Sequence, residues 1–277
     1  MTRTARLGLF VVRELREAVR SRWFVVYSAI FLVGGILLIG LGARDTLLSG
    51  YRGYARALAG LVHFSVVFVP LMALFPAAGS IAEERENGTL EYLLAQPVTR
   101  GEVFLGKWVG IALAVAGAIT AGYLLAGGLA VLRGVPLRFV GVSFAYLLLL
   151  ALAFVSLGTG LSAVSETRTR AITVGLLAWL AFIALGSLGA VTAFVRWGMP
   201  AGPLVAWTFV NPAEAFRLGM VALIDPDLGL LGPVGASVAG RAGPASVLWG
   251  AAASLALWTI VPLGLGAGGW LRRREGA

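Results

Sequence analysis

Five carboxylates gather in one short polar stretch, Ile81 to Lys107, between two long apolar runs. They are Glu83, Glu84, Glu86, Glu91 and Glu102, out of 13 Asp and Glu residues in the chain. Charged side chains are too costly for the hydrocarbon core of a bilayer, so the stretch is predicted to lie outside it. Such a stretch suits either a solvated connection or a charged docking element for another protein.

The same stretch contains a partial match to a phosphate-binding loop. Residues 101–107 read GEVFLGK and fit the pattern GxxxxGK. The next residue is Trp108, where the pattern needs a Ser or Thr to bind Mg²⁺. We therefore expect no nucleotide and no cofactor on this chain, so that ATP and Mg²⁺ act on a partner protein and this chain is not itself an enzyme.

Two other constellations could do chemistry. Ser143 follows Gly141 as in an intramembrane serine protease, with the single histidine, His63, as the base, but the second glycine beside the serine is missing. We keep this protease as a distant alternative, because a serine also suits close helix packing. His63 and Met72 fall on opposite faces of a helix and the chain has no cysteine, so no metal site is predicted.

Local signals divide the polar stretch into short helices. Asn87-Gly88 tolerates positive φ and predicts a break. Leu90, Leu93 and Leu94 then recur at helical spacing until Pro97. Thr99 and Glu102 fit a capping box, so we expect a helix, a break, a short helix, a second break and a helix.

A second capped helix is predicted near residue 211. Asn211-Pro212-Ala213-Glu214 places an Asn cap, a Pro at the first helical position and a Glu three residues after the cap. We expect this helix to run to about Leu223, within an extracytoplasmic helical segment 196–245. It is compatible with a capped helix that has no chemical role.

Composition identifies the class of protein. Of the 277 residues, 59% are hydrophobic and 13% are charged, against about 25% charged in soluble domains. Runs of about 20 apolar residues can cross the membrane. Six such spans are predicted: Trp23–Gly42, Leu61–Ala82, Val103–Leu132, Phe139–Ser165, Ala171–Val195 and Val247–Leu271. The fold class is therefore an all-α integral membrane protein, with Gly117, Gly264 and Gly268 as candidate close-packing positions.

The basic residues set the orientation. Residues 1–22 carry six Arg and a plausible apolar stripe, which predicts an amphipathic helix in the membrane interface rather than a cleaved signal. Lys107 is expected to snorkel from the start of the third span. Cytoplasmic termini place 14 of the 22 Lys and Arg residues in the cytoplasm. The net charge of +9 then needs no nucleic-acid partner.

Residues 82–108, AEERENGTLEYLLAQPVTRGEVFLGKW, resemble the signature of permease subunits in the ABC type 2 transporter family. The resemblance implies an elbow helix (1–22), a six-helix permease domain (23–271) with a cytoplasmic coupling loop (82–107), and a basic cytoplasmic tail (272–277). It also implies a multi-pass protein of a bacterial or archaeal plasma membrane, in contact with lipid, with a separate cytoplasmic ATPase subunit and a second permease copy.

The resemblance assigns roles to two groups of residues. ATPase docking is expected from Glu83, Glu84, Arg85, Glu86, Gly88, Thr89, Leu90, Glu91, Leu93, Leu94, Gln96 and Pro97. In that family the acidic residues meet the ATPase or the elbow helix, and the leucines fill a groove or pack back onto the bundle. An extracytoplasmic partner is expected to meet Asn211, Pro212, Glu214, Phe216 and Arg217.

The segment NPAEAFRL, residues 211–218, is similar to a subgroup of the same family. These are the permeases of the system that matures the copper centre of nitrous oxide reductase, with a periplasmic partner protein and a copper- or sulfur-related cargo. An exporter of lipid, peptide or drug is the alternative within the family. We expect no buried intramembrane acid, which disfavours proton-driven transport.

Overall fold

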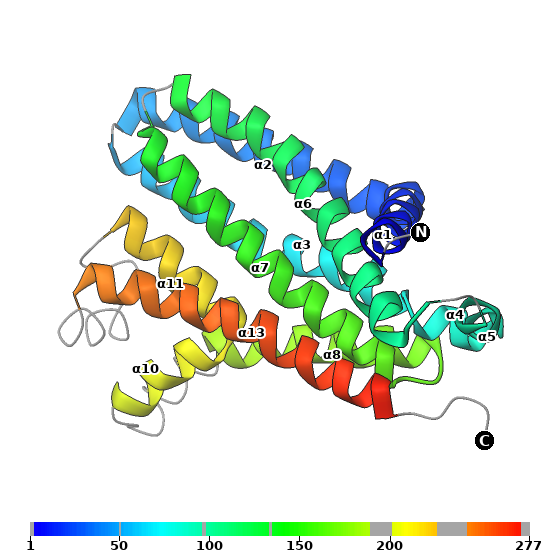
Figure 1. The fold of residues 1–277 in the computed structure, drawn as a ribbon. Helices are drawn as coiled ribbons and strands as arrows, with labels where there is room; N and C mark the ends of the chain where they lie inside the picture. The colour runs from blue at the N-terminus through cyan, green and yellow to red at the C-terminus, as the bar shows by residue number, and fades with distance from the viewer. Residues whose placement is uncertain are drawn as a thin grey trace.

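The structure is a computed structural model, and it describes residues 3–49, 51–95, 98–132, 135–188, 201–225 and 243–272. All regular elements in these ranges are helices. Figure 1 shows long helices packed side by side, with α1, the short helices α4 and α5, and the end of α13 gathered at one end. We call this the loop end of the bundle.

Among the described residues, five helices are long and apolar enough to cross a membrane by themselves, and a sixth span is reached if the bent pair of α1 and α2 is counted as one. This agrees with the predicted all-α membrane fold. The long helices are α2 (Arg22–Ser49), α3 (Tyr51–Gly79), α6 (Arg100–Leu132), α7 (Leu137–Val164), α8 (Arg168–Ile183) and α13 (Pro244–Arg272). Several of these helices are longer than the spans predicted for them. The length of an apolar run reflects the thickness of the bilayer, and a helix can continue beyond it.

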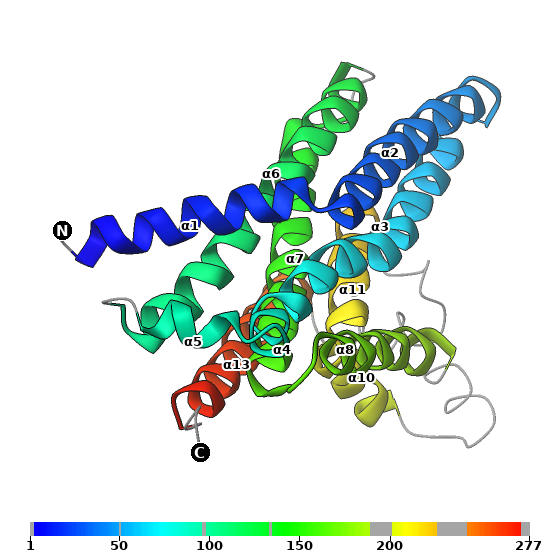
Figure 2. The ribbon, with the colours of Figure 1, turned by 90° about the vertical axis from the view of Figure 1, so that its right-hand side faces the viewer.

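The first helix, α1 (Arg3–Arg20), lies across α6 at a steep angle to the bundle (Figure 2). Its last turns are bent by 69° from the helix that follows, which is the geometry expected of an elbow. Gly110 of α6 permits the close contact, since a Cβ there would lie 2.5 Å from Cβ of Glu14 and 3.0 Å from the carbonyl oxygen of Val11. The elbow helix is therefore fastened to the third predicted span.

The core is centred on α7, which packs against α3, α6 and α13. Leu150 and Phe154 of α7 join Met72 of α3 in one buried cluster. A close backbone approach pairs Gly160 of α7 with Gly266 of α13, where a Cβ added at Gly266 would lie 2.4 Å from Cα of Gly160. The predicted close-packing glycines, Gly117, Gly264 and Gly268, have no such neighbour in the described chain.

The helices described within the predicted extracytoplasmic segment 196–245 are packed against the rest of the bundle. Helix α10 (Ala201–Val210) and helix α11 (Pro212–Ile224) pack into the bundle, α11 against α13, α7 and α3. At the break between them, Asn211 Nδ2 donates to Phe182 O at 2.7 Å and Trp258 Nε1 donates to Val210 O at 2.7 Å. The extracytoplasmic position of residues 196–245 stays a prediction, and within it the apolar residues of α11 pack against three spans.

Candidate functional site

The polar stretch folds as its local signals predict. Helix α4 (Ala82–Glu86) is followed by Gly88, whose φ of 69° lies in the left-handed region, and then by α5 (Thr89–Leu94). Before α6, Thr99 N donates to Glu102 Oε2 at 2.8 Å and Glu102 N donates to Thr99 Oγ1 at 3.3 Å, so the capping box is confirmed. Two of the predicted docking residues, Gln96 and Pro97, lie outside the described residues.

One side of α5 is attached to the bundle. Leu90 and Leu93 are buried in a cluster with Ile81, Val103, Phe104, Ala163 and Trp270. Leu94 is partly buried against the same cluster. The leucines therefore pack back onto the bundle, and they leave the opposite side of α5 for contacts outside the chain.

Arg85 is also turned inward. Its guanidinium donates to Ala163 O at 3.0 Å and to Ser165 O, two carbonyls at the end of α7. Those carbonyls have no partner within the helix, so a cation there satisfies them and complements the helix dipole. Arg85 thus positions the loop, and a docking role for it stays a prediction.

Two of the glutamates fix the start of α8. Glu83 Oε1 lies 2.7 Å from Arg168 Nη1, and Glu86 Oε2 accepts from the backbone N–H of Arg168 at 2.8 Å. Both side chains of the Glu83–Arg168 pair are almost half exposed, so the ion pair itself adds little stability. The contacts nevertheless join α4 to the turn between α7 and α8.

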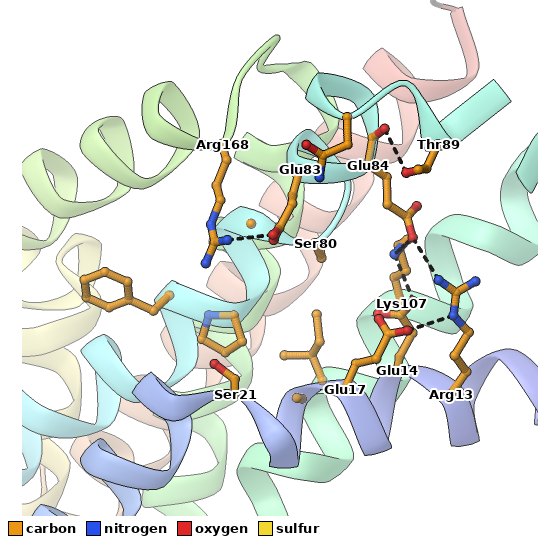
Figure 3. Close-up of a pocket in the computed structure, with 16 residues that line it drawn as sticks. Arg13, Glu14, Glu17, Ser21, Ser80, Glu83, Glu84, Thr89, Lys107 and Arg168 are labelled. Carbon is orange, nitrogen blue, oxygen red and sulfur yellow. Dashed lines mark hydrogen bonds and ion pairs between the residues drawn. The ribbon is translucent and has the colours of Figure 1, made fainter. Parts of the chain in front are cut away.

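A buried ionic cluster joins the loop to the elbow helix. Lys107 Nζ lies 2.8 Å from Glu14 Oε1 and 3.0 Å from Glu84 Oε1 (Figure 3). Arg13 Nη2 lies 3.6 Å from the same oxygen of Glu84. Lys107 is only 1% exposed, so the prediction that it snorkels to the interface is wrong. Two carboxylates from other helices, Glu14 and Glu84, pair with its buried ammonium group.

Burial raises the pKa of Glu14 above its ordinary value, and the neighbouring Lys107 opposes the shift. The direction follows from the loss of hydration on burial, which disfavours the charged carboxylate, and the negative charges of Glu17 and Glu84 add to it. Sequence reasoning did not identify Glu14, since its partners are far away in the chain. An acidic residue on the apolar side of an amphipathic helix is the signal that could have found it.

A cavity of about 470 Å³ opens beside this cluster, between α1, α3, α4, α6 and α8. We call it the elbow cavity (Figure 3). Its charged lining residues are Arg13, Glu14, Glu17, Glu83, Glu84, Lys107 and Arg168. The elbow helix and the predicted coupling loop therefore share one polar chamber.

The side of the loop that faces away from the bundle is formed by a few exposed residues. Tyr92 of α5 is 79% exposed. Glu86, Asn87, Thr89 and Glu91 are exposed beside it, and we call these five residues the coupling surface. Sequence reasoning missed Tyr92, although the leucine spacing places it on the opposite face of α5.

The second predicted group lies in a different part of the fold. Asn211, Pro212, Glu214 and Phe216 are buried, while Arg217 is partly exposed and binds Glu214 Oε2 through Nε at 3.0 Å and Nη2 at 2.6 Å. Contact with an extracytoplasmic partner stays a prediction for this group, and Arg217 is its most accessible member. Glu214 is a buried acid inside the bundle, and its partner is the cation of Arg217 three residues later.

The structure places the partial phosphate-binding motif and the serine of the protease alternative within long helices. Residues 101–107 belong to the continuous helix α6, and their lysine is held by carboxylates. Ser143 Oγ lies in α7 and donates to Phe139 O at 2.8 Å, next to Tyr123. The described residues contain no group of three His, Cys, Asp or Glu that could hold a metal ion.

Comparison with known proteins identifies the family. Residues 10–274 match the model of the ABC-2 family transporter proteins. The chain belongs to this family. It is 32% identical over 275 residues to the "Probable ABC transporter permease protein NosY" of Pseudomonas aeruginosa, covering 95% of this chain and 96% of the relative. A protein of the same description from Stutzerimonas stutzeri is 29% identical over 245 residues, with 86% and 88% coverage.

Membership in this family makes the chain a multi-pass membrane protein and the non-catalytic permease component of an ABC transporter. The loop of residues 82–107 can be described by its two sides. It presents the coupling surface on one side and fixed contacts to α1, α6, α7, α8 and α13 on the other.

Proposed function

We propose that the chain is a NosY-type permease driven by a separate, NosF-like ATPase subunit that carries ATP and Mg²⁺. Its cargo is a copper- or sulfur-related species used to mature the copper centre of nitrous oxide reductase. The observation that supports the subgroup is the near-complete coverage of two permeases described as NosY.

The coupling surface is the proposed contact for the ATPase. An aromatic side chain that is 79% exposed beside carboxylates is typical of a protein interface, where tyrosines serve as anchors. The other side of α5 is packed against residues of α6, α7 and α13. A displacement of Tyr92 by the ATPase would consequently reach three spans through rigid contacts.

Orientation follows from the loop end of the bundle. Helix α1, the coupling surface, the start of α8 and the end of α13 lie at this end (Figure 1), and their segments hold most of the Lys and Arg residues. The positive-inside rule therefore supports a cytoplasmic loop end with both termini in the cytoplasm. The membrane is the plasma membrane of a bacterium or archaeon.

Two further partners belong to the proposal. A second permease copy and lipid would cover the apolar faces of α8 and α13, where Leu177, Leu180, Ile260 and Leu265 are more than half exposed. A periplasmic, NosD-like protein would bind at the opposite end of the bundle. ATP-driven movement of two such bundles would then alternate access to a pathway between them.

The test is affinity purification of the chain from native membranes in mild detergent, followed by mass spectrometry. We expect an ATPase and a periplasmic repeat protein to accompany it. An ATPase alone would instead favour the exporter of lipid, peptide or drug, and the absence of any ATPase would refute the transporter proposal.

Docking has its own test with matched variants. Tyr92→Ala and Glu91→Arg should reduce recovery of the ATPase, whereas Tyr92→Phe keeps the ring and should retain it. Leu93→Asp is a poor test, because a buried charge would disrupt the loop itself. Unchanged recovery with Tyr92→Ala would show that the ATPase binds elsewhere.

A further inference from the structure

Helix α1 presents three different sides to its surroundings. Glu14 and Ala18 are buried on the side that packs against α6. Arg13 and Glu17 line the elbow cavity on a second side, which faces the loop. The third side consists of exposed residues that occupy one continuous arc at about 100° per residue. We call it the outer face of α1, and its residues are Val12, Arg16, Val19 and Arg20.

The order of residues around α1 sets the depth of the outer face in the membrane. Val12 and Val19, which are 52% and 48% exposed, lie on the edge of this face that is farther from the loop. Because α1 is bent by 69° from the start of α2, it runs along the membrane surface. The two valines then contact acyl chains, and Arg16 and Arg20 lie beside them at the level of the lipid headgroups.

The arginines of the outer face have no carboxylate partner in the described part of the chain. Glu17, the acid next to them in the sequence, accepts from Arg13 Nε at 2.9 Å on the loop side of the helix. Arg16 and Arg20 are four residues apart, so their like charges repel each other across one turn. Arg22, which is also exposed and without an ion pair among the described residues, adds a third positive charge nearby.

We propose that the outer face of α1 binds the headgroup of an anionic phospholipid. The phosphate lies between Arg16 and Arg20, whose guanidinium groups can each donate two N–H bonds to its oxygens, and the acyl chains pass Val12 and Val19. A negative headgroup also relieves the repulsion between the two arginines. A zwitterionic headgroup fits less well, because it carries a cation of its own and leaves the excess positive charge uncompensated.

The bound lipid would hold the elbow helix at the membrane surface. On another side of the same helix, Glu14 belongs to the buried cluster with Lys107 and Glu84. Lipid and loop would therefore act on one helix from two sides. The inference depends on the outer face alone and not on ATPase docking or on the cargo, so either can fail without the other.

Lipid retention tests the site directly. The full-length chain is placed in nanodiscs of phosphatidylcholine and phosphatidylglycerol in equal amounts and is then released into mild detergent. Native mass spectrometry counts the molecules of each lipid that stay bound. The test variant is Arg16→Gln with Arg20→Gln. The matched control is Arg170→Gln with Arg272→Gln, which removes the same charge from exposed arginines of α8 and α13 at the loop end of the bundle.

We expect the wild type to retain more phosphatidylglycerol than phosphatidylcholine. The ratio of the two should fall at least about five-fold in the test variant, which is the worth of one arginine near an anionic surface. It should change little in the control variant. An equal fall in the control would show only the general positive potential of the loop end and would overturn the site. An unchanged ratio in the test variant would overturn it too, as would a variant that keeps its lipid and loses the ATPase instead.

A second measurement tests the depth of the outer face without removing an arginine. The chain has no cysteine, so Val19→Cys provides a single thiol for a fluorophore, with Glu91→Cys on the coupling surface as the control. Lipids that carry a spin label at the top of the acyl chain should quench the fluorophore at position 19 and not the one at position 91. Equal quenching at both positions, or none at position 19, would contradict the proposed contact with lipid.

Discussion

Lys107 of α6 and Glu14 of α1 are 93 positions apart in the chain, and Nζ of the one lies 2.8 Å from Oε1 of the other. Because Lys107 also binds Glu84 of α4, one ammonium group joins the elbow helix, a membrane span and the loop that carries the coupling surface. Movement of the loop relative to α1 therefore requires this buried cluster to rearrange. We infer that the elbow helix moves together with the loop.

The first prediction concerns the lysine. Lys107→Met should destabilise the protein by about 3–5 kcal/mol, because it leaves Glu14 and Glu84 buried without their common cation. Lys107→Arg, which keeps the positive charge, should lose less stability than Lys107→Met. Thermal unfolding of the purified chain in detergent measures the difference, and a Met variant as stable as the wild type would show that the cluster carries little of the stability.

The second prediction is a pH dependence. Burial raises the folded-state pKa of Glu14, so between its unfolded value near 4.5 and the raised value the folded protein binds more protons than the unfolded protein. The contribution of Glu14 to stability is then greater below this window and declines as the pH rises through it. Relative to Glu14→Gln, the wild type should gain stability on acidification from neutral pH toward the window.

The comparison with Glu14→Gln isolates this residue, since all other carboxylates titrate in both proteins. Unfolding midpoints measured across the acidic range give the difference. A wild type that loses stability relative to Glu14→Gln on acidification would contradict the raised pKa.

Local signals in the sequence were sufficient to predict where the helices and breaks of the loop lie. The break at Gly88 depends on the backbone freedom of one residue, and the capping box on two residues three positions apart. The helix after Asn211, predicted to run to about Leu223 and observed as Pro212–Ile224, was found in the same way. Such features need only neighbours in the chain, so sequence reasoning can reach them.

The positions of the charges could not be predicted in the same way. Lys107 and Arg85 look like surface cations in the sequence, yet Lys107 binds Glu14, 93 positions away, and Arg85 binds Ala163 O, 78 positions away. Similarly, the sequence shows the cap of α11, but not that this helix packs against α3, α7 and α13. These outcomes depend on long-range packing, for which one sequence holds no local signal.

The third prediction separates positioning from docking. Arg85→Gln should lower stability by about 1.5–3 kcal/mol, because the charged hydrogen bonds to the carbonyls at the end of α7 are lost. Binding of the ATPase to the folded fraction should change less than with Tyr92→Ala. Thermal unfolding and titration with the ATPase subunit measure the two effects, and a stable Arg85→Gln variant that fails to bind would restore Arg85 as a docking residue.

The fourth prediction concerns the break between α10 and α11. Asn211 is 1% exposed, and its side chain has two functions. Oδ1 accepts from Ala213 N at 3.0 Å and caps α11, and Nδ2 donates to Phe182 O at 2.7 Å and ties the break to α8. Asn211→Ala should therefore cost about 2 kcal/mol, because it removes the cap and leaves buried polar groups without partners.

Asn211→Asp separates the two functions, since a carboxylate keeps the cap but cannot donate to Phe182 O. Its buried charge adds a cost of its own, so Asn211→Ser, which caps but is too short to reach α8, serves as the neutral control. If the tie to α8 matters, Ser should recover only part of the stability lost in Ala, as measured by thermal unfolding. Full recovery by Ser would show that the cap alone holds α11 in the bundle.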